Sequence, residues 1–100
     1  MTSHSLPLPE LSPGQSTVLE LAGQRVFLCR SALGLHAMRD VCPHQDLSLE
    51  GARVRQGAVM CPHHGARFNL ADGRSLSPLT PNGLSLLPCR AGEGMLEIDL

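Results

Sequence analysis

The sequence predicts an all-β fold, either an antiparallel sandwich or a small barrel. Apolar segments are short and separated by glycine and proline turn signals, and none shows a long helical period. Runs of short strands between such turns are typical of all-β architectures. The length of 100 residues allows one domain with a modest core, so we predict a single domain over residues 1–100.

The predicted strands follow one another closely along the chain. Three of them form a meander over residues 16–39, with turns at Ala22-Gly23 and at residues 31–33. Their bounds are Ser16 to Leu21, Arg25 to Arg30 and Gly34 to Arg39. The later strands are Val54 to Met60, Arg67 to Leu70, Arg74 to Leu76, Leu84 to Arg90 and Met95 to Asp99. An Asp72-Gly73 turn separates two of these.

Charge and hydropathy exclude several classes of function. The chain has 8 basic and 9 acidic residues, for a net charge of −1, which indicates neither a basic face for nucleic acid nor a polybasic membrane patch. No stretch is apolar enough to span a bilayer, and the first residues lack the features of a signal peptide. We therefore expect a cytoplasmic protein in which Cys29 and Cys89, both in apolar segments, are reduced thiols.

Two short motifs contain paired metal ligands. They read Cys42-Pro-His44 and Cys61-Pro-His63-His64, with sixteen residues between His44 and Cys61. Each motif lies in a loop bounded by proline or glycine, so the two loops can close on one polynuclear centre. Iron–sulfur clusters need thiolate ligands, and replacing two thiolates on one iron by imidazoles defines the Rieske 2Fe-2S type. The spacing fits that type.

On these motifs the chain resembles the Rieske-type ferredoxins of aromatic ring-hydroxylating dioxygenase systems. Gly65, the Asp72-Gly73 turn and Pro78 also match family positions, and the resemblance covers most of the chain. It implies the Rieske iron–sulfur fold, in which an antiparallel β-sandwich scaffold carries a small cluster-binding subdomain. We expect that subdomain at approximately residues 40–79.

The resemblance also implies one 2Fe-2S cluster and its ligands. Cys42 and Cys61 would bind the inner iron. His44 and His64 would bind the outer iron through one ring nitrogen each, whereas His63 would not be a ligand. Two thiolates and two neutral imidazoles leave the oxidised centre near zero charge, so it should be easier to reduce than a centre with four thiolates.

The function implied is electron transfer without bond chemistry of the chain's own. The expected partners are a flavin-dependent ferredoxin reductase, which supplies single electrons, and a terminal Rieske oxygenase, which receives them. We expect a monomer. The cluster loops would form an apolar tip from Pro43, Leu47, Pro62 and Pro78, with Gln45, Asp46 and His63 at its rim, and partners would dock there transiently.

The reduction potential is expected at the low end of the family's range of roughly −150 to +300 mV. High-potential Rieske proteins have a disulfide between the cluster loops, and serine and tyrosine hydroxyls near the cluster sulfurs. The corresponding positions here are Leu47 and His63 for the disulfide, Ala66 for the serine and Phe68 for the tyrosine. Because hydrogen bonds to the sulfurs favour the reduced state, their absence lowers the potential.

Three alternatives belong to other functional classes. The small subunit of an assimilatory nitrite reductase is a related type that frequently lacks the ligands, all four of which are present here. A zinc-binding interaction module would use other ligand spacings, usually Cys-x2-4-Cys with His-x3-5-His. A terminal oxygenase needs an additional mononuclear iron site of two histidines and a carboxylate, for which this chain has neither the residues nor the length.

Overall fold

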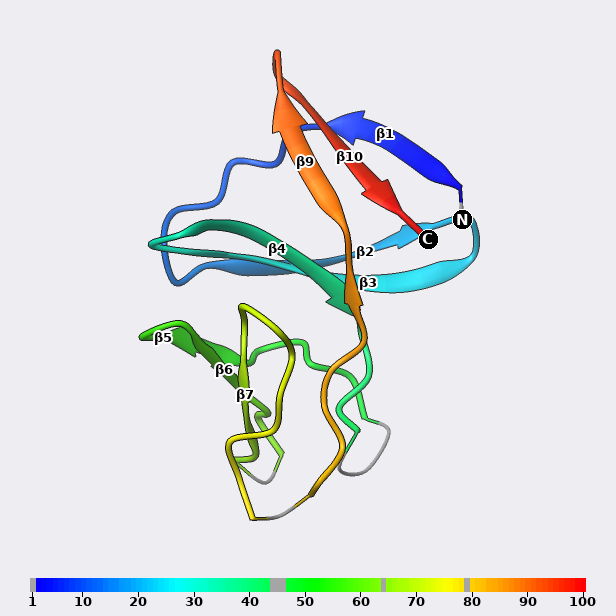
Figure 1. Cartoon of the computed structure of the whole chain (residues 1–100). Helices are drawn as coiled ribbons and strands as arrows, with labels where there is room; N and C mark the ends of the chain where they lie inside the picture. The colour runs from blue at the N-terminus through cyan, green and yellow to red at the C-terminus, as the bar shows by residue number, and fades with distance from the viewer. Residues whose placement is uncertain (1, 44–46, 64, 79) are drawn as a thin grey trace.

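The computed structural model describes residues 2–43, 47–63, 65–78 and 80–100. Within these residues, ten strands form three antiparallel sheets and no helix occurs, which confirms the all-β prediction (Figure 1). The strands are β1 (Ser3–Pro7), β2 (Ser16–Leu21), β3 (Gln24–Ser31), β4 (Gly34–Arg39), β5 (Arg53–Arg55), β6 (Ala58–Met60), β7 (Arg67–Asn69), β8 (Leu86–Leu87), β9 (Cys89–Gly92) and β10 (Met95–Asp99). The described part of the chain therefore offers no helix that could cross a membrane.

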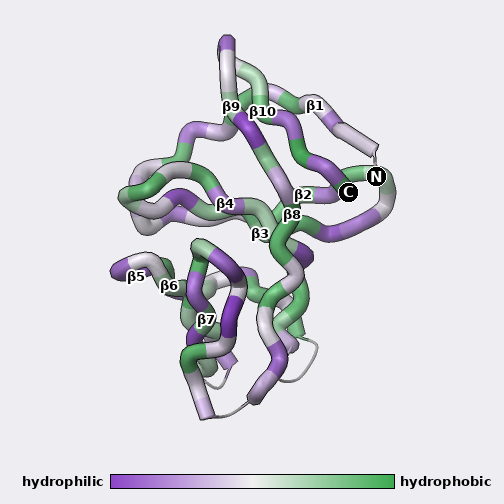
Figure 2. The backbone as a smooth tube through the Cα atoms, viewed as in Figure 1, coloured by the Kyte–Doolittle hydropathy of each residue, from purple (hydrophilic) through white to green (hydrophobic). Residues whose placement is uncertain are grey.

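The central sheet has the order β2-β3-β4-β8 and is covered on both faces, as Figures 1 and 2 show. Strand β3 accordingly contains four consecutive fully buried residues, Val26 to Cys29. Such a continuous apolar run is typical of a strand that is buried on both faces. Val26 and Leu28 join the core beneath the β1-β10-β9 sheet, and Phe27 and Cys29 join the core above the β5-β6-β7 sheet.

The β5-β6-β7 sheet carries the second motif and alternates strictly between its two faces. Val54, Val59 and Phe68 lie opposite one another in the register and are buried in the core shared with the central sheet. Their neighbours along each strand point the other way, because side chains alternate across a strand. The motif that begins with Cys61 follows directly after β6, so this sheet fixes its position.

The prediction of one strand from Val54 to Met60 is wrong, because this segment forms a hairpin of two short strands, β5 and β6. Gln56 and Gly57 both have positive φ, 51° and 74°, and they form the turn between β5 and β6. Two successive positive φ values give the turn that matches the twist of paired strands. Gln-Gly lacks the asparagine or aspartate that usually signals such a turn, so the sequence indicated an unbroken run.

Two further strand predictions also need correction. Arg74 to Leu76 forms only an isolated bridge between Ser75 and Phe68. The predicted strand from Leu84 to Arg90 divides at Pro88 into β8, which pairs with β4, and β9, which pairs with β10. Proline has no N–H group for a ladder, so it marks the point where the chain passes from one sheet to the next.

Strand β1 was not predicted, because Ser3, His4 and Ser5 are polar and a proline directly follows Leu6. It pairs with β10 at the edge of the outer sheet, where Pro7 is tolerated. Thr2 and Leu100 exchange two backbone hydrogen bonds of 3.0 Å each. The two ends of the chain therefore lie side by side, on the side of the central sheet that faces away from the motif loops (Figure 1).

Gly73 and Gly83 lie in contact at the two ends of a third loop, residues 74–83. The amide of Leu84 donates to the carbonyl oxygen of Gly73 at 2.8 Å. A Cβ atom on Gly83 would lie 2.6 Å from that same oxygen, which is too close for any side chain. Inside this loop, the Ser75 hydroxyl donates to the Thr80 carbonyl at 2.6 Å.

Replacing Gly83 by alanine is therefore expected to lower the free energy of unfolding by roughly 1–3 kcal/mol, since backbone must shift to admit the methyl group. Gly92→Ala is the matched control, because nothing lies within 4 Å of a Cβ atom at that position. Urea denaturation of the two variants measures the difference. Equal stabilities of the two variants would show that the backbone at Gly73 can move to admit the methyl group without loss of stability.

Candidate metal centre

Cys42 and Cys61 begin the two motifs, and the fold places both in one core. Cys42 follows the end of β4, and Cys61 follows β6 directly. Their exposed fractions are 0% and 2%, and both belong to the buried cluster that includes Phe68 and Leu49. Two cysteines nineteen positions apart in the chain thus belong to the same buried cluster.

Each of the two loops is closed by a backbone hydrogen bond of the same kind. The amide of Cys42 donates to the carbonyl of Leu47 at 2.7 Å, and the amide of Cys61 donates to the carbonyl of Ala66 at 2.7 Å. Each cysteine is therefore anchored to the residue five positions later. Gly65, whose φ of 73° favours glycine, adds a bond from its amide to the Cys61 carbonyl at 3.0 Å.

His63 connects the second loop to the first. Its Nε2 atom lies 3.2 Å from the backbone oxygen of Ser48, which requires that Nε2 carry the proton and donate. The side chain is exposed, as predicted for a residue at the rim. The contact adds a role that the motif alone did not indicate, since His63 holds the two loops together.

The two predicted histidine ligands, His44 and His64, lie outside the described residues, as do the rim residues Gln45 and Asp46. Among the residues that are described, no group of three or more potential ligands gathers. The described half of the donor set nevertheless fits a 2Fe-2S cluster. Two buried cysteines share one core at the base of matched loops, and each loop continues toward a histidine in the sequence.

Asp40 closes the base of the first loop, a role that was not predicted. Its side chain is fully buried and accepts three hydrogen bonds. The donors are Arg25 Nε at 3.0 Å, Ser48 Oγ at 2.7 Å and the Leu49 amide at 2.7 Å. These donors come from β3 and from the far end of the loop, so Asp40 clamps both ends of the segment that contains Cys42. The only sequence signal for this role was the position of an acidic residue directly after β4.

Most of the residues expected at the apolar tip reach solvent. Leu47 is 38% exposed, Pro62 and Pro78 are also exposed, and Pro43 is half-buried. Val41, directly before Cys42, is 42% exposed. Ala66 and Phe68 are fully buried, and neither has a hydroxyl group to offer to a cluster sulfur.

The remaining cysteines are thiols in the structure, as expected. Burial, with a smaller contribution from Cys89, raises the pKa of Cys29 to about 12, so this thiol is protonated at any physiological pH. Cys29 belongs to one core cluster, whereas Cys89 packs against the other. The two residues behave as small hydrophobes in separate cores.

His36 gives the fold a pH dependence. Burial lowers its pKa from the ordinary value of 6.5, and its Nε2 atom lies 2.7 Å from Ser31 Oγ. A lowered folded-state pKa means that the unfolded chain binds the proton more readily. The stability that the neutral imidazole contributes is fully present above pH 6.5 and is lost as the pH falls below that value.

We expect His36→Gln to reduce the fall in melting temperature between about pH 7 and about pH 5. Melting curves of both proteins across this range test it, and parallel pH profiles would contradict it.

Comparison with known proteins identifies relatives for most of the chain. The sequence model of the Rieske [2Fe-2S] domain matches residues 5–86. Chlorophyllide a oxygenase of Chlamydomonas reinhardtii is 33% identical in an alignment of 101 positions that covers 96% of this chain and 15% of the oxygenase. The ferredoxin component of the alkene monooxygenase system of Xanthobacter autotrophicus is 30% identical in an alignment of 70 positions that covers 69% of this chain and 57% of that protein. The chain thus spans about a seventh of the first relative and just over half of the second.

Solved structures share the fold over nearly the whole chain. The ferredoxin of carbazole 1,9a-dioxygenase from Nocardioides aromaticivorans has a TM-score of 0.82 at 17% identity and covers 94% of this chain, which in turn covers 95% of that ferredoxin. The terminal oxygenase of the same system has a TM-score of 0.80 at 26% identity, where the match covers 95% of this chain and 29% of the oxygenase. The fold therefore occurs both as a separate small protein and as part of larger chains.

Proposed function

The chain belongs to the Rieske [2Fe-2S] domain family, and from that membership we propose that it is an electron-carrying ferredoxin of a multicomponent oxygenase system. It would receive single electrons from a flavin-dependent reductase and deliver them to a terminal Rieske oxygenase, without catalysis of its own. A bound 2Fe-2S cluster supplies the one-electron oxidation and reduction. Residues 1–100 would form one domain, with a cluster-binding subdomain at about residues 40–79.

We assign the cluster ligands as Cys42, His44, Cys61 and His64. The observation that supports the proposal best is the burial of both cysteines in one core, while Leu47 and Pro62 of the same two loops are exposed. Buried cysteines keep water away from the inner half of the site. The exposed surface lets a partner approach the outer half, which suits transfer between proteins rather than chemistry in a pocket.

The chain's own residues would serve this role by holding the loops still. Asp40 and the backbone bonds from the two cysteines fix the loops, and His63 links them. A rigid site changes little between its oxidised and reduced forms, so each electron moves with little rearrangement. A small apolar contact surface favours brief complexes that separate after transfer. We expect a cytoplasmic monomer.

The test is electron paramagnetic resonance of the dithionite-reduced protein after anaerobic purification, combined with iron and sulfide analysis. We expect the spectrum of a Rieske centre and two atoms each of iron and sulfide per chain, as the cluster type requires. Colourless protein after faithful reconstitution, or bound zinc in place of iron, would overturn the proposal. Transfer to a nitrite reductase but not to an oxygenase would favour the nitrite reductase subunit.

The docking surface has a matched pair of test variants. Leu47 lies on the apolar surface beside the first motif, whereas Leu33, which is 80% exposed, lies in the turn between β3 and β4. We expect Leu47→Asp to slow electron transfer to the oxygenase roughly five- to tenfold, since a charge must be desolvated in the contact. Leu33→Asp should leave the stopped-flow rate unchanged. Equal effects of the two variants would place the contact elsewhere.

A further inference from the structure

The outer face of the β5-β6-β7 sheet gathers positive charge beside the second motif. Arg53 and Arg55 lie on β5 and Arg67 lies on β7, and all three are exposed. The register aligns Arg53, Met60 and Arg67 in one row across the three strands. Opposite residues of an antiparallel pair project to the same face, so two guanidinium groups flank the methionine.

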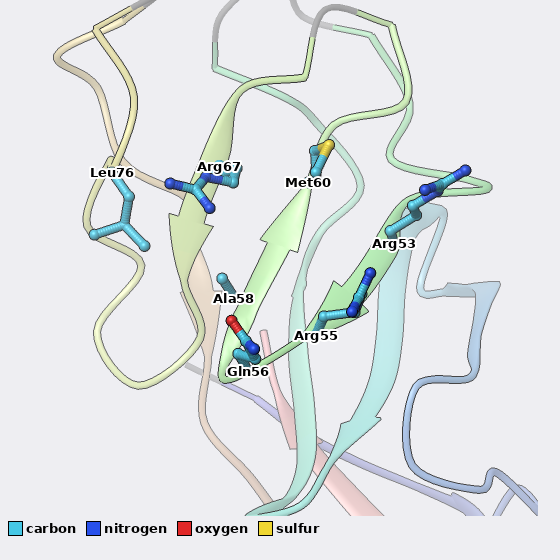
Figure 3. Close-up of a pocket in the computed structure, with 7 residues that line it drawn as sticks. All are labelled: Arg53, Arg55, Gln56, Ala58, Met60, Arg67 and Leu76. Atoms are coloured by element: carbon cyan, nitrogen blue, oxygen red, sulfur yellow. The ribbon is translucent and has the colours of Figure 1, made fainter.

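This face is hollow, with an apolar floor between the arginines. A depression of about 370 Å³ is bordered by the three arginines, Gln56 and Leu76, and Ala58 and Met60 form its floor (Figure 3). Figure 3 shows the arginines on the two outer strands, the smaller side chains of β6 between them, and Leu76 beyond Arg67. We call the surface formed by these seven residues the arginine trough.

The arginines of the trough have no ion-pair partner among the described residues. The ion pairs there join Arg25 to Asp40 and Arg90 to Glu97 and Asp99. The chain as a whole carries a net charge of −1, so three exposed arginines on one small sheet are a local excess of positive charge. Such an excess favours a partner that brings carboxylates or other anions.

The floor of the arginine trough also lies against the second loop. Met60 directly precedes Cys61, and its Sδ atom lies 3.9 Å from the position that a Cβ atom on Gly65 would take. A partner seated in the trough would therefore rest on the outer side of the loop that starts at Cys61. The apolar tip, expected from Pro43, Leu47, Pro62 and Pro78, shares this loop only through Pro62.

We propose that the arginine trough is a second docking surface, which binds an acidic patch on a protein redox partner. This inference rests on the proposed role as an electron carrier. An apolar floor between guanidinium groups suits a protein, because interfaces are enriched in arginine and methionine. Single-stranded nucleic acid fits poorly, since bases stack on aromatic side chains, and both phenylalanines of this chain are fully buried.

The first experiment measures binding without any redox reaction. A fluorescent glutamate-rich peptide that contains leucines is titrated with the holoprotein at low salt, next to its glutamine counterpart and an oligothymidylate. We expect the glutamate peptide to bind, the glutamine peptide not to bind, and Arg53→Glu/Arg67→Glu to weaken binding roughly tenfold or more. Arg74→Glu is the matched control, because Arg74 is an exposed arginine outside the trough. Tighter binding of the oligothymidylate, or equal binding by the two variants, would overturn the inference.

The second experiment measures stopped-flow electron transfer from an NADH-fed flavin reductase and to a terminal oxygenase. We expect Arg53→Glu/Arg67→Glu to slow at least one of the two steps roughly tenfold at low salt, with Arg74→Glu close to the wild type. Arg53→Gln/Arg67→Gln should fall between them, and unchanged paramagnetic resonance spectra show that the cluster is intact. If both steps proceed at wild-type rates in the charge-reversed variant, the second docking surface is refuted while the carrier function stands. If the wild type exchanges electrons with neither partner, the carrier function fails, and peptide binding alone then decides whether the trough recognises acidic chains.

Discussion

Cys61→Ala is expected to remove the cluster completely. The side chain is 2% exposed and lies in the same core as Cys42, and the loop over residues 61–66 contains no second cysteine that could replace it. A 2Fe-2S centre with three protein ligands would be open to water and would be lost during purification. Iron and sulfide contents should fall to near zero, and the visible absorbance and the paramagnetic resonance signal should disappear.

Cys29→Ala provides the control for this effect. Cys29 is equally buried and belongs to the same core cluster, but it lies on the central sheet. The truncation therefore costs similar packing without touching the proposed ligands, and iron and sulfide contents should stay at the wild-type level. If Cys61→Ala kept a full cluster with an unchanged spectrum, or if Cys29→Ala lost it, the ligand assignment would be wrong.

The second large effect is expected at Asp40. Asp40→Ala leaves the Leu49 amide and the Ser48 hydroxyl without their acceptor, and it removes the partner of Arg25. Losing hydrogen bonds to a buried carboxylate should lower the free energy of unfolding by roughly 2–3 kcal/mol. Because both ends of the first loop separate, the cluster should also be lost faster to a chelator. Urea denaturation and the decay of visible absorbance measure the two effects.

Two further variants isolate the role of Asp40. Asp40→Asn keeps the shape and one acceptor oxygen, so it should lie between the wild type and Asp40→Ala. Asp99→Asn removes a half-buried carboxylate on β10 whose partners are Arg90 and Ser3, and it should change cluster lifetime little. The role of Asp40 in holding the loop would be excluded if Asp40→Ala lost its cluster no faster than Asp99→Asn.

The sequence predicted those parts of the fold that depend on local signals. The bounds of Ser16–Leu21, Gly34–Arg39 and Met95–Asp99 are confirmed, since each segment has alternating apolar residues and a clear turn beside it. Strand β1 depends instead on pairing with β10, ninety residues later, which no local pattern encodes. The break at Pro88 could not be predicted for the same reason, because it depends on β8 pairing with β4 and β9 pairing with β10.

The candidate site likewise has parts that local sequence signals predicted and parts that depend on the folded structure. The two motifs indicated cysteines and histidines directly, because ligand spacing is a local property. The clamp formed by Asp40 requires residues from β3 and from the end of the first loop to come together. The arginine trough was hidden by the net charge, which is nearly zero, and only the register places Arg67 in the row of Arg53. Composition describes the total charge, whereas docking depends on where that charge lies.

The pairing of Thr2 with Leu100 makes this domain easy to build into other proteins. Both chain ends leave from the outer sheet, far from the loops that begin at Cys42 and Cys61 (Figure 1). A linker or a further domain attached at either end would not obstruct the surface proposed for electron transfer. The same geometry suits a fold that occurs both as a separate ferredoxin and as part of a longer oxygenase chain.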